Sequence, residues 1–162
     1  MLPLILVLAF LVCVGCSYQE PIESELDFTC DDPELTKIVL DAAQEWTDAG
    51  VVKAAMITVN VNPKGIPIKW ADGDDLPKLC NVKPQAIKGC VSYKYDSLFF
   101  NKALSPDWLR IVVMHELIHA IVPTKDHLPK ELMGIMNVEG NNDGTITQND
   151  LDFLSDRGAQ IV

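Results

Sequence analysis

The sequence predicts an α+β fold with a small mixed sheet, and three observations indicate this class. Apolar residues at helical spacing fill 33–49. Runs with the alternation and β-branched residues of strands follow at 54–62, 66–75, 90–95 and 97–101. A long helix over 106–122 and a short one within 145–156 complete the chain. A helix, then strands, then further helices is an order typical of α+β domains.

The N-terminal segment is set apart from the folded domain by its composition. Residues 1–16 carry no charged side chain, and an apolar run of about a dozen residues is too short to span a bilayer. It fits the hydrophobic core of a signal peptide over 1–15. The polar and acidic stretch that follows predicts a tether over 16–29. One domain, 30–162, then remains.

The end of this segment, "CVGC" at 13–16, resembles the lipobox of bacterial lipoproteins. The resemblance implies that Cys16 is lipidated and becomes the mature N-terminus. The protein would then be exported and anchored at the cell envelope, whereas without lipidation it would be secreted.

The chain is strongly acidic, with a formal net charge of −10. Such a charge opposes binding to nucleic acid and to anionic membrane surfaces. We therefore expect no nucleic-acid partner, contact with a membrane only through the lipid anchor, and a monomer.

Three cysteines lie beyond the lipobox. Cys80 and Cys90 flank a turn-rich loop and are candidates for a disulfide in an exported protein, which would leave Cys30 free. Pairing of Cys30 with either of the others is an alternative that the sequence leaves open.

The element ends carry recognisable signals. Asp32 is the predicted N-cap of the early helix, with Pro33 at the first helical position and Gly50 as the stop. Ser105 caps the long helix, which we expect to end at Val122 because proline follows. Thr147 is the predicted N-cap of the last helix.

All three histidines of the chain lie within 115–127. His115 and His119 stand four residues apart on the long helix, so both rings share one face. With Glu116 they form an HExxH arrangement, in which two histidines bind zinc and the glutamate serves as general base.

Catalytic zinc needs three protein ligands and an open fourth position. His127 follows the helix end at Pro123, and we favour it as the third ligand. Glu139 is the alternative, because its spacing from His119 resembles that of thermolysin-like enzymes. Its surroundings, "NVEGNNDG", predict a loop rather than the helix those enzymes use.

These residues, followed by "ELMGIMN" at 131–137, resemble the metzincin metallopeptidases, especially the small matrixin-like ones. The resemblance implies a zincin catalytic domain with an early helix, an active-site helix and a short C-terminal helix. It also implies that Met136, or alternatively Met133, lies in a turn beneath the metal, and that the substrate pairs with a sheet edge near 89–93. The sequence departs from the family at Val122, where metzincins have glycine, and has two extra residues before the last histidine.

The function expected from this pattern is a zinc-dependent endopeptidase acting on a protein or peptide substrate. A zinc-activated water would attack the peptide carbonyl with Glu116 as general base. The alternative is a non-catalytic binding lipoprotein with a structural metal.

Two acidic segments are weaker candidates for calcium. Residues 139–150 resemble an EF-hand loop through Glu139, Asn141, Asp143, Gly144 and Asp150, although the first and last ligands are atypical. The acidic turn at 72–75 is better explained as an exposed charged turn.

Overall fold

The computed structural model describes residues 25–83, 87–94, 96–137 and 143–162. The predicted signal peptide (1–15), Cys16 and most of the predicted tether lie outside these ranges. Within them, no helix has the length and apolar character needed to cross a membrane.

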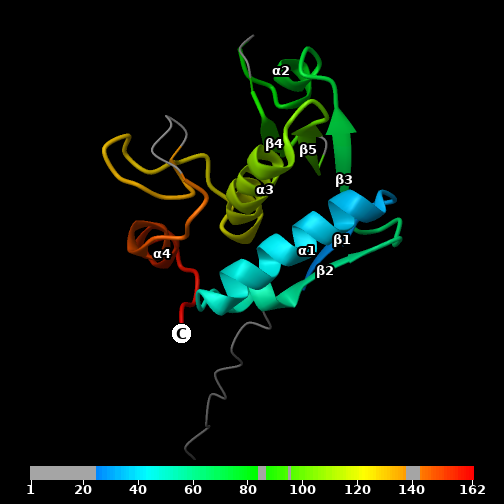
Figure 1. The fold of residues 1–162 in the computed structure, drawn as a ribbon. Coiled ribbons are helices and arrows are strands. Elements are labelled where there is room, and N and C mark those ends of the chain that lie inside the picture. The colour runs from blue at the N-terminus through cyan, green and yellow to red at the C-terminus, as the bar shows by residue number, and fades with distance from the viewer. Residues whose placement is uncertain (1–24, 84–86, 95, 138–142) are drawn as a thin grey trace, which may run out of the picture.

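One five-stranded sheet organises the described residues, as Figure 1 shows. Its order is β2-β1-β3-β5-β4, and every neighbouring pair is parallel except β4 and β5, which are antiparallel. Four α-helices accompany the sheet, so the α+β prediction is confirmed at this level. The strands are β1 (Leu26–Thr29), β2 (Ile57–Asn60), β3 (Ile66–Ala71), β4 (Gly89–Ser92) and β5 (Ser97–Asn101).

Strand β1 corrects the expected boundary of the domain at residue 30. Residues 26–29 were assigned to the acidic tether, yet they form an inner strand between β2 and β3, with Phe28 fully buried. The acidic side chain of Asp27 has local partners, because its carboxylate accepts hydrogen bonds from Thr58, Asn60 and Asn62. The folded domain therefore begins within the predicted tether.

Helix α1 (Pro33–Asp48) starts at the predicted cap. The Asp32 carboxylate accepts the backbone N–H groups of Glu34 and Leu35 at 2.9 and 3.0 Å, and the Trp70 indole N–H at 2.7 Å. The region after α1 differs from the prediction, since Val52–Met56 forms a 3-10 helix, η1, before β2 begins at Ile57. A compact turn there lets the chain reverse from α1 into the sheet.

Helices α1 and α3 (Pro106–Ile121) lie on one face of the sheet (Figure 1). Trp46 of α1 is fully buried and donates its indole N–H to the Met114 carbonyl of α3 at 3.1 Å. Leu98 and Phe100 of β5 face these helices. Phe99 alternates with them and packs on the opposite face with the short helix α2 (Leu76–Leu79), which the sequence did not predict.

The C-terminal part of the chain closes against α1. Helix α4 (Gln148–Ser155) follows the predicted cap Thr147, and Ile161 then bridges to Val51. The Val162 N–H donates to the Gly50 carbonyl at 3.0 Å. Gly50 has φ of +94°, a conformation that favours glycine and that ends α1 at the predicted position.

Cys80 and Cys90 form a disulfide, and Cys30 is free and buried. The bond joins the residue that ends α2 to the edge strand β4. Because β4 has a neighbour on one side only, the disulfide is a second attachment that holds this strand against the sheet.

Replacing both Cys80 and Cys90 by serine should lower the free energy of unfolding by about 2–3 kcal/mol, the loop-closure contribution of a ring of this size. Urea denaturation under non-reducing conditions measures the change. The matched control is Cys30→Ala, which leaves the disulfide intact. An unchanged unfolding midpoint in the double variant would show that the bond does not constrain the unfolded chain.

Asp32→Ala should destabilise the domain in a pH-dependent way. The hydrogen bonds to Leu35, Trp70 and Glu34 lower the pKa of Asp32 in the folded state. The stabilisation from its charge is therefore complete above about pH 5 and declines as the pH falls through the folded-state pKa. The difference in Tm between wild type and variant should narrow below about pH 4, and a difference independent of pH would contradict this role of the charge.

Candidate metal centre

Helix α3 brings two of the three histidines into the interior. His115 and His119 are both buried, and they stand one helical turn apart. The residues around them, such as Met114, Leu117 and Ile118, are fully buried as well, and all of 112–119 is buried, whereas the first turn of α3 is exposed. Two imidazoles therefore sit in fixed positions on the buried part of this helix.

The third histidine arrives from the segment after α3. The helix ends at Ile121, and Val122 is extended with φ −118° and ψ 102°, which starts the turn that the sequence predicted at Pro123. The loop is then secured on both sides of His127. Arg157 binds the Asp126 carboxylate at 3.1 Å, and the Leu128 N–H donates to the Met136 carbonyl at 3.1 Å.

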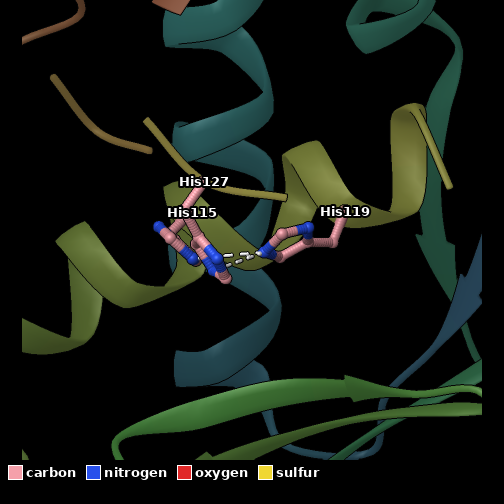
Figure 2. Close-up of side chains that lie close together, drawn as sticks. All are labelled: His115, His119 and His127. Carbon is pink, nitrogen blue, oxygen red and sulfur yellow. Dashed lines mark hydrogen bonds between the residues drawn. The ribbon is translucent and has the colours of Figure 1, made fainter. Parts of the chain in front are cut away.

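The three rings converge, as Figure 2 shows. The Nε2 atom of His119 lies 3.2 Å from Nε2 of His115 and 3.3 Å from Nε2 of His127. The candidate ligand atoms of the three residues all lie within 4.8 Å of one another. In the part of the chain that the structure describes, no other group of three or more histidine, cysteine or acidic side chains is arranged in this way. The cluster could hold a metal ion.

Hydrogen bonding and burial favour the ligand form of these rings. Nδ1 of His115 lies 2.8 Å from the Ile135 carbonyl, so Nδ1 carries the proton and Nε2 presents its lone pair to the cluster. Burial lowers the pKa of His115 to about 4 and, together with the two neighbouring histidines, lowers that of His119 to about 3. Burial also lowers the pKa of His127. All three imidazoles are thus neutral near pH 7, as metal binding requires.

The environment of His119 differs from that of His115. The backbone of Thr124 opposes the lowering of its pKa, yet the buried Nδ1 atom of His119 has no hydrogen-bond partner among the described residues. A buried ring nitrogen without a partner is costly. The ring of His119 is therefore positioned mainly by packing within the buried part of α3.

Glu116 links the cluster to the sheet. Its side chain is only 7% exposed, and Oε2 accepts the Val91 N–H of β4 at 3.0 Å. Burial raises the pKa of Glu116 to about 8, although the hydrogen bond from Val91 opposes the shift. A carboxyl with a pKa near neutrality, beside a candidate metal site, is suited to proton transfer.

A cleft of about 650 Å³ opens over these residues. One wall is β4, which is the edge strand expected near 89–93, and the other is α3 with the loop that carries His127. Tyr93 ends the stretch 89–93 and lines this wall, with contacts that the sequence did not predict. Its hydroxyl donates to the Thr124 carbonyl at 3.2 Å and lies 3.4 Å from the His119 carbonyl, so it joins the end of β4 to the histidine loop.

The segment 133–136 contacts the histidine cluster through the Ile135 carbonyl. Met136 is fully buried in the main core, whereas the side chain of Met133 is 45% exposed. The burial favours Met136 over Met133 for the predicted methionine turn. The Met136 N–H donates to the Asp150 carboxylate at 2.9 Å, which fixes this turn beside the Ile135 carbonyl that contacts His115.

Among their described residues, the candidate calcium segments form no group of three or more possible metal ligands. Glu139, which was also the alternative third metal ligand, and Asn141 lie outside the described residues. Asp150 is fully buried, and its two oxygens accept the N–H groups of Met136 and Thr147 at 2.9 Å each. Asp150 therefore has a structural role at the position where an EF-hand loop would need a calcium ligand. At the acidic turn, Asp72 pairs with Lys102 at 2.5 Å.

No protein-family model matches the chain, and no curated protein matches its sequence.

The full chain should bind about one divalent metal ion, and His127→Ala should weaken that binding by at least roughly 100-fold, because one of three direct ligands is lost. Elemental analysis and calorimetric titration with Zn²⁺ measure both quantities. Lys130→Ala, an exposed change three residues away, is the matched control. Equal metal retention by wild type and His127→Ala would point to Glu139 as the third ligand, and no metal in either would leave a helix with coincidental histidines.

Proposed function

We propose that this chain is a zinc-dependent endopeptidase of the metzincin type, similar to the matrixins. The observation that carries the proposal is the meeting of three histidine Nε2 atoms beside the buried carboxyl of Glu116, in a cleft bounded by an edge strand. A purely structural metal would not need an ionisable carboxyl at this place.

The donor set fits zinc. Imidazole nitrogens about 2.0–2.1 Å from one tetrahedral zinc ion lie about 3.3–3.4 Å from each other. The two Nε2 separations that involve His119, 3.2 and 3.3 Å, match that spacing. Three neutral nitrogen ligands leave a fourth position, which is the arrangement of catalytic rather than structural zinc sites.

Zinc, when bound, supplies a Lewis acid and lowers the pKa of water to about 7. With the metal bound, Glu116 would act in its ionised form: its carboxylate would take a proton from the attacking water and deliver it to the leaving amine. The N–H of Val91 holds Oε2 so that the carboxyl stays oriented toward the cleft.

Strand β4 offers backbone groups for pairing with an extended substrate. The Lys88 carbonyl accepts the Asn101 N–H, so by antiparallel alternation Gly89 and Val91 turn their N–H and C=O groups away from β5. The Val91 N–H is donated to Glu116, so the groups proposed for pairing with a substrate strand are the N–H and C=O of Gly89 and the C=O of Val91. A peptide strand could add to this edge and place its carbonyl near Glu116.

We further propose that the protein is exported and held at the cell envelope through a lipid on Cys16. The apolar N-terminal segment with its lipobox-like ending supports this location. The disulfide between Cys80 and Cys90 also supports it, because such bonds persist in oxidising compartments.

Glu116→Gln should lower kcat/KM for peptide hydrolysis by about 10²–10⁴-fold, while the fold and the metal content stay unchanged. Glutamine keeps the side-chain volume and can still accept the Val91 N–H, so only proton transfer is lost. Cleavage of a fluorogenic peptide library measures activity, and elemental analysis and thermal unfolding are the controls. Unaltered proteolysis in the variant would exclude this mechanism. Metal binding without hydrolysis in the wild type would favour the non-catalytic binding lipoprotein.

A further inference from the structure

The two buried histidines of the candidate metal centre differ in the support of their outer ring nitrogens. A histidine that binds a metal through Nε2 carries its proton on Nδ1, and that N–H needs an acceptor. For His115 the acceptor is the Ile135 carbonyl at 2.8 Å. The buried Nδ1 atom of His119 has no hydrogen-bond partner among the described residues. An acceptor for the Nδ1–H of His119 is therefore what the centre still requires.

The backbone carbonyl of Thr124 is the group placed to become that acceptor. Thr124 lies where the chain has left α3 and turns back toward His127. Its backbone opposes the lowering of the His119 pKa, which is the effect of an acceptor close to a ring N–H. The Nε2 atom of His119 faces the other two histidines, so Nδ1 is the nitrogen left for Thr124.

Tyr93 holds this carbonyl from the opposite wall of the cleft. The Tyr93 hydroxyl donates to the Thr124 carbonyl at 3.2 Å and lies 3.4 Å from the His119 carbonyl. The residue that follows β4 is thus joined to the last turn of α3 and to the loop after it. Burial and the charge of Glu116 raise the pKa of Tyr93, so the hydroxyl keeps the proton that it donates.

Thr124 also connects to the third histidine. Its hydroxyl accepts the Asp126 N–H at 3.1 Å, and Asp126 directly precedes His127. Thr124 therefore contacts the backbone that leads to His127 through its side chain, while its carbonyl lies near His119. Fixing this one residue constrains two of the three candidate ligands.

The end of α3 needs such support because it lacks a glycine cap. Val122 is extended, and the last carbonyls of a helix have no partners within the helix. Side chains from other elements meet two of them: Lys53 of η1 donates to the Ile121 carbonyl at 3.2 Å, and the Tyr93 hydroxyl approaches the His119 carbonyl. They take the place of the backbone hydrogen bonds that a glycine at a helix end provides.

We propose that Tyr93 is a positioning residue of the metal centre, whose hydroxyl holds the Thr124 carbonyl as acceptor for the Nδ1–H of His119 when zinc is bound at Nε2. The inference rests on the proposed function, because it requires zinc at the histidine cluster. Tyr93 acts on His119 through Thr124, just as Asp150 acts on His115 through the turn that carries the Ile135 carbonyl.

Tyr93→Phe tests this role, because it removes the hydroxyl and keeps the ring in the cleft wall. Competition of the full chain with a chelating indicator measures the dissociation constant for Zn²⁺. It should rise about three- to tenfold, which is less than the roughly 10–100-fold cost of losing a group bonded directly to a ligand, because the Thr124 carbonyl remains. In long-range ¹H–¹⁵N spectra of the zinc-loaded protein, the His119 Nδ1–H signal should be sharp in the wild type and broadened by exchange with water in the variant.

Ser92→Ala is the matched control. The Ser92 hydroxyl donates to the Leu79 carbonyl at 2.7 Å, so this variant also removes a hydroxyl–carbonyl hydrogen bond at the end of β4, but one that does not involve Thr124. Its Tm should fall while its zinc dissociation constant stays at the wild-type value. An unchanged dissociation constant and an unchanged Nδ1–H signal in Tyr93→Phe would overturn the proposal. An equal loss of zinc affinity in both variants would overturn it as well, since loosening of β4 alone would then account for the loss.

Peptide cleavage by the wild type separates this proposal from the proposed function. Unchanged zinc affinity in Tyr93→Phe, with cleavage by the wild type, would leave the peptidase standing and remove the role of Tyr93. Weakened zinc binding in the variant, with no cleavage by the wild type, would retain that role and reject the peptidase. A wild type that binds no zinc would reject both.

Discussion

Burial of the middle of α3, residues 112–119, is the constraint on which the rest of this structure depends. The helix is covered by α1 through Trp46, by β5 through Leu98 and Phe100, and by the segment that contains Met136. A helix in that position would ordinarily be apolar throughout, and polar groups within it must find partners. His115 finds the Ile135 carbonyl and Glu116 finds the Val91 N–H. The polar residues of the site are therefore also the contacts that orient α3 against its surroundings.

Residues of the C-terminal region support the candidate metal centre indirectly, by holding the segments that contact it. Asp150 at the start of α4 holds the backbone of Met136 and thereby positions the Ile135 carbonyl. Arg157, just after α4, holds Asp126 next to His127. Arg110 of α3 pairs with Glu45 of α1 and also reaches the Gly144 carbonyl. The part of the chain farthest in sequence from the strands thus fixes the loop that completes the histidine cluster.

Local sequence signals predicted the structure correctly wherever one residue and its near neighbours in the chain determine it. The Asp32–Pro33 cap, the stop at Gly50 and the shared face of His115 and His119 are of this kind. Strand β1 was missed because Asp27 looks like tether sequence, and its partners Thr58, Asn60 and Asn62 are more than thirty residues away. The contacts of Tyr93 were missed for the same reason, since its role depends on Thr124. The three lysines that line the cleft come from two segments, 87–94 and 124–127, that only folding brings together.

The three tryptophans of the chain occupy three distinct environments. Trp46 is sealed in the core against α3, Trp70 is half-buried with its N–H on a carboxylate, and Trp108 lies under a lysine at the mouth of the cleft. Indole emission responds to polarity and to nearby charge, so the three rings report on different parts of the molecule. The intrinsic fluorescence of this protein is thus a composite spectrum, whose blue component follows the integrity of the interior and whose red component follows the occupancy of the cleft.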